Sequence, residues 1–163
     1  MLVPFDSLSD DARIWMYQSN RAFSDKEAQL ITDRLHNFVG TWKRHGQDLK
    51  GSFLLLKNHF IVLAVEESFN PVSGCAIDAS VQTIKELESL LQLDVTNRMN
   101  VSFKDGENIN VVGLGDFQKY ASEKKITGDT VVFNNLVATK IELETQWEVK
   151  AKNSWHKRYL KNV

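Results

Sequence analysis

The sequence predicts an α+β fold: a ferredoxin-like β-α-β-β-α-β sheet with an extra strand and a C-terminal helical extension. Two stretches repeat apolar residues at helical spacing, and several short apolar runs are typical of strands. The order in which they alternate is that of the ferredoxin-like fold. Because the inner strands are apolar on both faces, we expect the C-terminal extension to cover the second sheet face. The alternative cover is a second copy of the chain, in a homodimer through that face.

The first strand is expected over residues 12–18, whose two sides are both apolar. The first helix should begin at the capping box Ser24-Asp25-Lys26-Glu27, in which the Ser24 and Glu27 side chains each bind the other's backbone N–H. Its apolar stripe runs from Ile31 to Trp42. We expect His45-Gly46 to end this helix, since glycine readily adopts the left-handed conformation that follows a helix.

A β-hairpin should follow, with strands over residues 52–56 and 60–65 joined by Lys57-Asn58-His59. The strand Phe60–Val65 carries apolar side chains at every position, which predicts a central strand covered on both sides. Residues 68–74 are expected to form a loop. A second helix follows, with its apolar stripe between Ile77 and Leu91.

Two short strands, around residues 101–103 and 109–111, flank the Asp105-Gly106 pair, which suggests a two-residue turn. That turn would place Ile109 and Val111 on the opposite face from Phe103. Pairing Phe103 with Ile109 keeps the apolar side chains together. We therefore expect an odd-length loop or a bulge here.

The remainder of the chain should contain a short helix at residues 116–124 and a short strand at 130–133. Residues 139–149 fit a helix, because Thr139-Lys140-Ile141-Glu142 is a second capping box, but their alternation also fits a strand. A terminal helix is expected after Ser154.

Length and composition predict a single domain over residues 1–163, of ordinary globular composition. The formal net charge of −1 argues against nucleic acid and anionic membranes as partners. The longest apolar run, Phe60–Val65, is far shorter than the roughly 20 residues of a membrane-spanning helix, and the N-terminus does not resemble a secretory signal. The single cysteine, Cys75, fits a reducing compartment, so we expect a soluble cytoplasmic protein.

Five segments carry a resemblance to a known family: Val3-Pro4-Phe5, residues 13–18 (RIWMYQ), residues 73–78 (SGCAID), residues 97–101 (NRMNV) and residues 154–158 (SWHKR). With these segments the chain resembles a small uncharacterised family of bacterial proteins whose members often carry the label "ABC transporter ATPase". The resemblance runs over nearly the whole chain. It implies no activity for any residue, since the family has none established.

The ATPase label fails on chemistry. A P-loop ATPase needs Gly-x-x-x-x-Gly-Lys-Ser/Thr, because backbone amides cradle the phosphates while the lysine and the hydroxyl handle charge and magnesium. The sequence contains no Gly-Lys dipeptide, and its nearest glycine cluster, Gly113-Leu114-Gly115, lacks the lysine.

The sharpest candidate site is the segment Ser73–Asp78, between a buried strand and a helix. With Ser73 as N-cap, Cys75 lies in the first helical turn, where the helix dipole favours a thiolate and free amides can bind an anion. His45 and His59 are the candidate bases for such a thiol. The candidate ligand-binding residues are Ser73, Gly74, Cys75, Asp78 and Arg98. The alternative, which we favour, is a small buried Cys75 that packs the helix on the sheet, with Asp78 balancing the dipole.

Two further groups of residues have plain interpretations. Glu66-Glu67, with Asp78 and Asp94, could form an acidic site, but their spacing fits solvated carboxylates better. The four histidines and the lone cysteine have no metal-ligand spacing, so we expect no metal and no cofactor.

Three functions remain as hypotheses. The first is a non-catalytic module that binds a small ligand or a protein, using the loop 68–75 and the surface near the C-terminal helix. The second is a thiol- or anion-dependent enzyme built on Cys75. The third is nucleic-acid binding by the basic residues 148–163, whose Trp155 and Tyr159 could stack on bases. For that segment we favour a helix docked on the core through its aromatic side chains.

Overall fold

The structure is a computed structural model that describes residues 1–68 and 71–160. It confirms the α+β class, with helices and antiparallel strands in both halves of the chain. Residue contacts group the chain into two compact units. The first unit contains residues 1–96 and 138–141, and the second contains residues 97–137 and 142–163. The single domain expected from the chain length stays a prediction.

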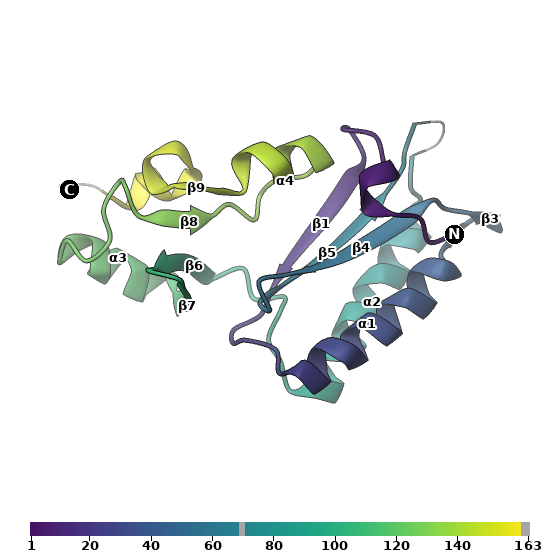
Figure 1. The fold of residues 1–163 in the computed structure, drawn as a ribbon, viewed down its shortest axis with the longest axis horizontal. Helices are drawn as coiled ribbons and strands as arrows, with labels where there is room; N and C mark the ends of the chain where they lie inside the picture. Colours follow the sequence, from purple (N-terminus) through teal and green to yellow (C-terminus); the bar gives the residue numbers. More distant parts are fainter. Residues whose placement is uncertain (69–70, 161–163) are drawn as a thin grey trace. The chain divides into compact units, whose positions relative to one another are not determined.

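The first unit is built on an antiparallel sheet with the strand order β1 (Arg13–Gln18), β5 (Phe60–Val65), β4 (Gly51–Leu56). All six residues of β5 are buried, so the prediction of a central strand covered on both sides is confirmed. The helices α1 (Asp25–Gly40) and α2 (Gly74–Leu91) lie side by side on one face of this sheet, where their apolar stripes pack against alternate residues of β5 (Figure 1). A 3-10 turn, η1 (Phe5–Ser7), precedes β1.

Helix α1 begins as predicted and ends earlier than predicted. The capping box is present: the Glu27 N–H donates to Ser24 Oγ over 3.1 Å, and the Ser24 N–H donates to Glu27 Oε1 over 2.9 Å. The helix stops at Gly40, however, so its predicted end at His45-Gly46 is wrong.

Residues 45–46 instead form the turn of a small hairpin, β2 (Lys43–Arg44) and β3 (Gln47–Asp48). His45 and Gly46 have φ angles of 49° and 80°, the left-handed values that such a tight turn requires. Because α1 ends before Trp42, the buried Trp42 indole lies where its Nε1–H donates to the Ala76 carbonyl over 2.9 Å. The left-handed signal of His45-Gly46 was therefore real, but it marks a hairpin rather than a helix end.

The free edge of β1 is bridged by residues 138–141, which return to the first unit from later in the chain. The Ile14 N–H donates to the Ala138 carbonyl over 2.9 Å, and Arg13 pairs with Thr139. The ferredoxin-like fold would place its fourth strand beside β1. The strand that follows α2 belongs to another sheet, so the ferredoxin-like order is not confirmed.

The second unit contains an antiparallel sheet with the strand order β7-β6-β8-β9. Its strands are β6 (Asn100–Asp105), β7 (Asn108–Gly113), β8 (Val131–Phe133) and β9 (Glu148–Lys150). Helix α3 (Leu114–Ser122) contributes Phe117 to a core that also contains Val101, Ile126, Val132 and Ala151.

The β6–β7 hairpin has a two-residue turn, so the odd-length loop or bulge expected here is wrong. Asp105 pairs with Asn108 across Gly106-Glu107, and Phe103 pairs with Asn110. Gly106 has a φ of 62°, which favours the short turn. The apolar residues tolerate this register because Val112 joins the core face while Ile109 and Val111 are half-buried on the other face.

Residues 139–149, whose sequence fits either a helix or a strand, contain both, because helix α4 (Lys140–Gln146) is followed by strand β9. The terminal helix expected after Ser154 is instead a 3-10 helix, η3 (Trp155–Tyr159), preceded by another, η2 (Ala151–Asn153). The docking prediction is confirmed, because Trp155, Tyr159 and Leu160 pack against the core of the second unit.

Candidate functional site

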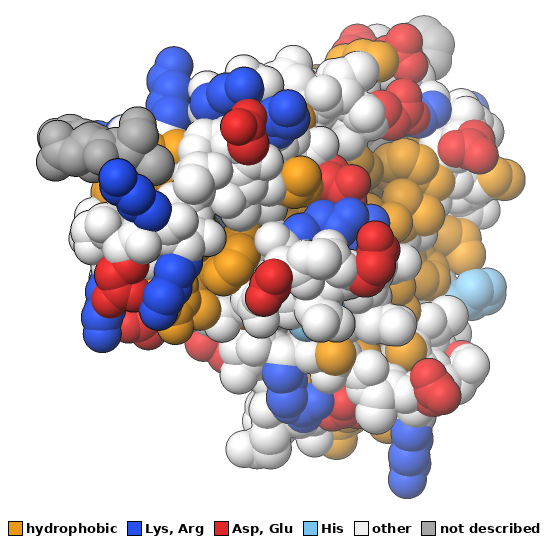
Figure 2. Space-filling model, turned by 60° about the vertical axis from the view of Figure 1, so that its left-hand side comes forward, with side chains coloured by type: hydrophobic (Ala, Val, Ile, Leu, Met, Phe, Trp, Pro, Cys, Tyr) orange, Lys and Arg blue, Asp and Glu red, His pale blue; other side chains and the backbone are white. Residues whose placement is uncertain are grey.

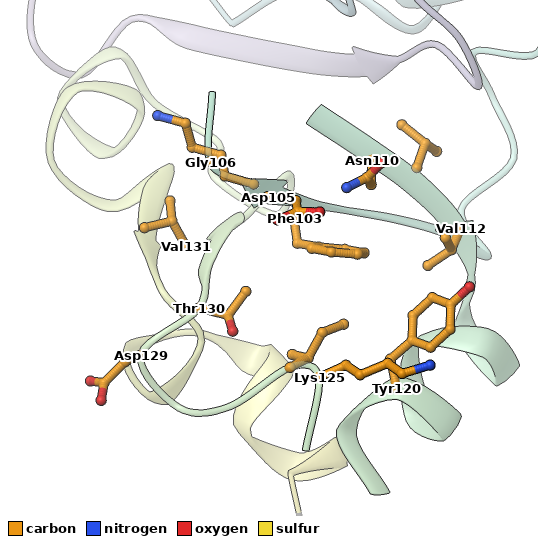
Figure 3. Close-up of a pocket in the computed structure, with 13 residues that line it drawn as sticks. Phe103, Asp105, Gly106, Asn110, Val112, Tyr120, Lys125, Asp129, Thr130 and Val131 are labelled. Carbon is orange, nitrogen blue, oxygen red and sulfur yellow. The ribbon is translucent and has the colours of Figure 1, made fainter. Parts of the chain in front are cut away.

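A groove of about 800 Å³ lies in the second unit, beside the tip of the β6–β7 hairpin (Figure 3). The hairpin's register explains its position. On the core-facing side, Val101 and Val112 at the base pack into the core, whereas Asp105, Asn108 and Asn110 toward the tip are polar. Because polar side chains do not fill a core, the core ends at Phe103 and leaves a hollow.

Three parts of the second unit form the walls of the groove. The β6–β7 hairpin lies on one side, and the end of α3 and the segment 125–131 lie on the other. The lining residues are Phe103, Lys104, Asp105, Gly106, Asn110, Val111, Val112, Tyr120, Lys125, Ile126, Asp129, Thr130 and Val131.

The floor of the groove is aromatic. The Phe103 ring meets the buried Phe117 ring edge-on, at 6.3 Å between centroids, and the Tyr120 ring at 6.4 Å. The Lys125 ammonium lies 5.6 Å from the centroid of the Tyr120 ring. Phe103 and Tyr120 are only half-buried, so part of their ring surface is open to a ligand.

The charges around the groove are balanced. Lys125 Nζ pairs with Glu123 at 2.9 Å, which raises the pKa of Lys125 and lowers the pKa of Glu123. Lys152 and Lys150 approach Asp129 at 3.0 and 3.7 Å, and the hydrogen bond from Lys152 is the main reason that the pKa of Asp129 is lowered. Figure 2 likewise shows basic and acidic side chains interspersed over one face of the molecule. The rim of the groove therefore carries both signs of charge and does not favour ligands of one sign over the other.

This arrangement suits binding better than bond-making. The described residues that line the groove include no histidine, cysteine or serine. The Thr130 hydroxyl accepts a hydrogen bond from the Thr127 N–H over 2.9 Å, and the groove supplies no imidazole to activate it. What the groove offers is an aromatic floor, the Asn110 amide and charged groups at the rim.

No protein-family model, no curated protein and no solved structure matches this chain. The resemblance to the uncharacterised bacterial family stays a prediction.

Cys75 is exposed, so the interpretation that we favoured, a buried packing residue, is wrong. Ser73 is the N-cap of α2 as predicted, and its Oγ accepts from the Ala76 N–H over 3.2 Å. Cys75 therefore lies in a capped first turn with its side chain in solvent. Asp78 lies beyond the first turn, which contains no acidic residue, so its predicted place beside the helix dipole is wrong as well.

The two candidate bases differ in their distance from Cys75. The Trp42–Ala76 hydrogen bond ties the start of α2 to the end of the sheet where Gly51 pairs with Val65. His59 lies at the other end of β5, about 20 Å from Val65 along the strand, and its Nδ1 is 3.0 Å from the Lys57 carbonyl oxygen. His45, in the exposed β2–β3 turn, lies toward the Cys75 end.

Arg98 is not gathered with the other predicted ligand-binding residues within one unit. It is exposed and belongs to the second unit, whereas Ser73, Gly74, Cys75 and Asp78 belong to the first. The predicted set therefore does not form one site within either unit.

Glu66 and Glu67 have structural partners. Glu66 accepts hydrogen bonds from Ser9 and Ser68; burial raises its pKa, but these hydrogen bonds outweigh burial and the pKa is lowered. Glu67 accepts from the Val72 N–H over 2.9 Å and pairs with Arg13 at 3.6 Å. Within residues 1–68 and 71–160 there is no cluster of three potential metal ligands, and no helix is long and apolar enough to cross a membrane.

The basic C-terminal segment is engaged in packing. Lys150 and Lys152 pair with Asp129, and the Trp155 ring stacks on the His156 ring at 3.8 Å between centroids. Trp155 and Tyr159 belong to the core packing. The aromatic side chains that nucleic-acid binding would need are thus largely committed to the fold; Lys161 lies outside the described residues.

Two features are not predictable from local sequence patterns. The residues of the groove come from separate stretches of the chain, and the one available signal is Asn110, a polar residue between Ile109 and Val111. The second is His156, which is fully buried and whose pKa burial lowers to about 4. Its Nδ1 lies 2.8 Å from Ser154 Oγ, while its Nε2 has no hydrogen-bond partner among the described residues.

Proposed function

We propose that this protein is a non-catalytic binding protein whose groove in the second unit takes a small organic ligand with an aromatic or other flat apolar part. The observation that carries the proposal is the groove itself, with its accessible Phe103 and Tyr120 rings and its mixed polar rim. Its volume lies within the ~300–1,000 Å³ that ligand pockets commonly have.

Different lining residues would bind different parts of the ligand. A flat apolar group gains most from the Phe103 and Tyr120 rings, whose half-exposed faces then leave water. The Asn110 amide can donate and accept at once, and Lys125 can bind a polar or anionic substituent. The Lys125–Glu123 pair is exposed, so exchanging Glu123 for a ligand anion costs little.

The probe for this site is anilinonaphthalene sulfonate, an aromatic anion whose fluorescence rises in an apolar environment. We expect saturable binding to the folded chain and about three- to tenfold weaker binding for Lys125→Ala, since the variant removes one partly exposed charge. Lys124→Ala is the matched control, because Lys124 is the neighbouring exposed lysine and does not line the groove. Circular dichroism of each variant verifies folding.

The proposal fails if Lys125→Ala binds the probe as tightly as the wild type and the Lys124→Ala control do. A second variant, Tyr120→Leu, keeps an apolar side chain at the α3 position but removes the ring. We expect it to weaken the probe more than Lys125→Ala does, because it removes the stacking surface rather than a screened charge.

A second candidate, a thiol- or anion-dependent enzyme built on Cys75, is favoured by one observation, the exposure of the thiol in the capped first turn of α2. His45 is the base that this candidate would use, because His59 lies at the far end of β5. The alkylation rate of Cys75 as a function of pH tests it. A His45→Ala variant with an unchanged pH profile would remove His45 from the mechanism.

A further inference from the structure

Strand β7 forms one edge of the sheet in the second unit and presents unpaired backbone groups. Residues that flank a two-residue turn form a hydrogen-bonded pair, and the pattern alternates along an antiparallel ladder. Asn108, Asn110 and Val112 therefore bond to β6. The N–H and C=O groups of Ile109 and Val111, and the N–H of Gly113, point away from the sheet and have no partner among the described residues. The Gly113 carbonyl, at the N-cap of α3, accepts the first hydrogen bond of that helix.

Natural proteins usually protect such an edge with charges, proline, a bulge or a covering segment. The other edges here follow this rule to different degrees. Strand β9 has only three residues, two of them charged, and the β1 edge is bridged by residues 138–139. The edge of β4 is covered at its first residue, where Gly51 exchanges hydrogen bonds with Met1 and Val3.

Strand β7 has none of these protections. Its six residues, Asn108 to Gly113, include no charge and no proline, and its register with β6 is continuous. Three of its residues are β-branched and half-buried, which suits further strand pairing.

We propose that β7 pairs with β7 of a second copy of this chain, antiparallel and centred on Val111, so that the two sheets join edge to edge in a homodimer. In this register Val111 faces Val111 and Ile109 faces Gly113. The two Val111 residues exchange their N–H and C=O groups, and each Gly113 N–H donates to the Ile109 carbonyl of the other copy. Within the two strands no charged side chain faces another, so the strand pairing itself meets no like-charge repulsion.

In this register the tip of each hairpin meets the start of α3 of the other copy. The same register carries Glu107, exposed at the hairpin tip, toward Gly115 of the second copy, in the first turn of its α3. Helix α3 has no side-chain cap, because its N-cap residue is Gly113. The remaining free N–H groups of this turn attract a carboxylate, but Asp116 lies in the same turn and repels it, and the Leu114 N–H already donates to the Met99 carbonyl. The pairing therefore rests on the backbone groups of β7 and not on this contact.

The first test is the mass of the full chain in solution by light scattering over a range of concentrations. We expect a dimer for the wild type and a monomer for Val111→Pro, whose dimer dissociation constant should be at least tenfold higher. Proline at residue 111 removes an outward N–H while leaving the ladder to β6 intact. Val111→Thr keeps the N–H and is the matched control, expected to stay dimeric.

A wild type that stays monomeric at every concentration overturns the proposal, as does a folded Val111→Pro that stays dimeric. Should that variant fail to fold, cross-linking decides the matter. In a Cys75→Ser background, Val111→Cys should form a disulfide-linked dimer with a mild oxidant and Ile109→Cys should not, because Ile109 faces Gly113 of the second copy. Equal cross-linking at both positions contradicts the register. None of these measurements depends on a ligand in the groove.

Discussion

His156 makes the stability of the second unit sensitive to acid. The side chain is fully buried between the Trp155 and Phe117 rings, and burial lowers its pKa from 6.5 to about 4. Between these two values the unfolded chain binds a proton that the folded chain does not. Stability contributed by the neutral imidazole is therefore present above pH 6.5 and is lost as the pH falls toward 4.

A shift of this size corresponds to about 3 kcal/mol in the free energy of unfolding. Urea denaturation at pH 7 and pH 4.5 should show a loss of this order in the wild type. His156→Gln should be less stable at pH 7, because it disturbs the ring packing, but should lose much less between the two pH values. Equal losses in both proteins would remove His156 as the cause.

The exposure of Cys75 leads to a simple expectation for its chemistry. In the native protein the thiol should react with a disulfide reagent such as dithionitrobenzoate at a rate within about tenfold of that in the unfolded chain, since solvent access governs the reaction of an unhindered thiol. The measurement is the change in absorbance with time, in buffer and in denaturant. Protection by two orders of magnitude would place Cys75 in a covered position instead.

At the scale of elements, the start of α1 combines a cap with an ion pair. Arg21 donates to both oxygens of Glu27, each over 2.8 Å, and this interaction, followed by the Ser24 N–H, lowers the pKa of Glu27 to about 2. The stability from Glu27 is present above its ordinary pKa of 4.5 and is lost as the pH falls toward 2.

Replacing the cap should therefore have a measurable cost. We expect Ser24→Ala to lower the free energy of unfolding by about 1 kcal/mol at pH 7, the usual cost of a lost N-cap. Chemical denaturation measures it. Ser122→Ala is the control, an exposed serine at the end of α3 whose loss should cost less than about 0.5 kcal/mol. Equal effects of the two substitutions would show that the Ser24 cap contributes no more to the free energy of unfolding than an exposed serine at a helix end.

The elements that the sequence predicted well are those with a local cause. Ser24 and Ser73 start their helices through their own hydroxyls, and the apolar run Phe60–Val65 requires a central strand wherever it lies. The end of α1 depends on a distant contact, the Trp42 hydrogen bond to Ala76, which no local pattern reveals. The β6–β7 register likewise depended on both hairpin faces being partly covered.

The candidate site was hardest to predict for the same reason. Phe103, Tyr120 and Lys125 meet only because α3 folds back on the hairpin, and their spacing in the sequence resembles no binding motif. Cys75 drew attention because its motif is contiguous. Its place in the first turn of α2 was predicted correctly, whereas its exposure, which depends on tertiary packing, was not.

At the scale of the whole molecule, Lys140 ties together distant parts of the first unit. Its side chain is buried, and Nζ donates to the Leu8 carbonyl over 2.8 Å and to the Asp6 carbonyl over 3.1 Å. We expect Lys140→Met to cost about 2–4 kcal/mol, because two carbonyls lose a charged donor while the apolar stem is kept. Urea denaturation measures the cost. Lys124→Ala, at an exposed lysine, should be nearly neutral, and a neutral Lys140→Met would contradict the role given to the amine.

The return of residues 138–141 to the first unit affects how the chain folds during synthesis. The N-terminal 96 residues leave the ribosome without the segment that bridges β1 and without the Lys140 anchor. The first unit thus stays incomplete until the intervening stretch of the second has also emerged. Neither unit is one continuous stretch of the chain. A truncation near residue 96 would therefore remove residues 138–141 from the first unit instead of separating two complete units.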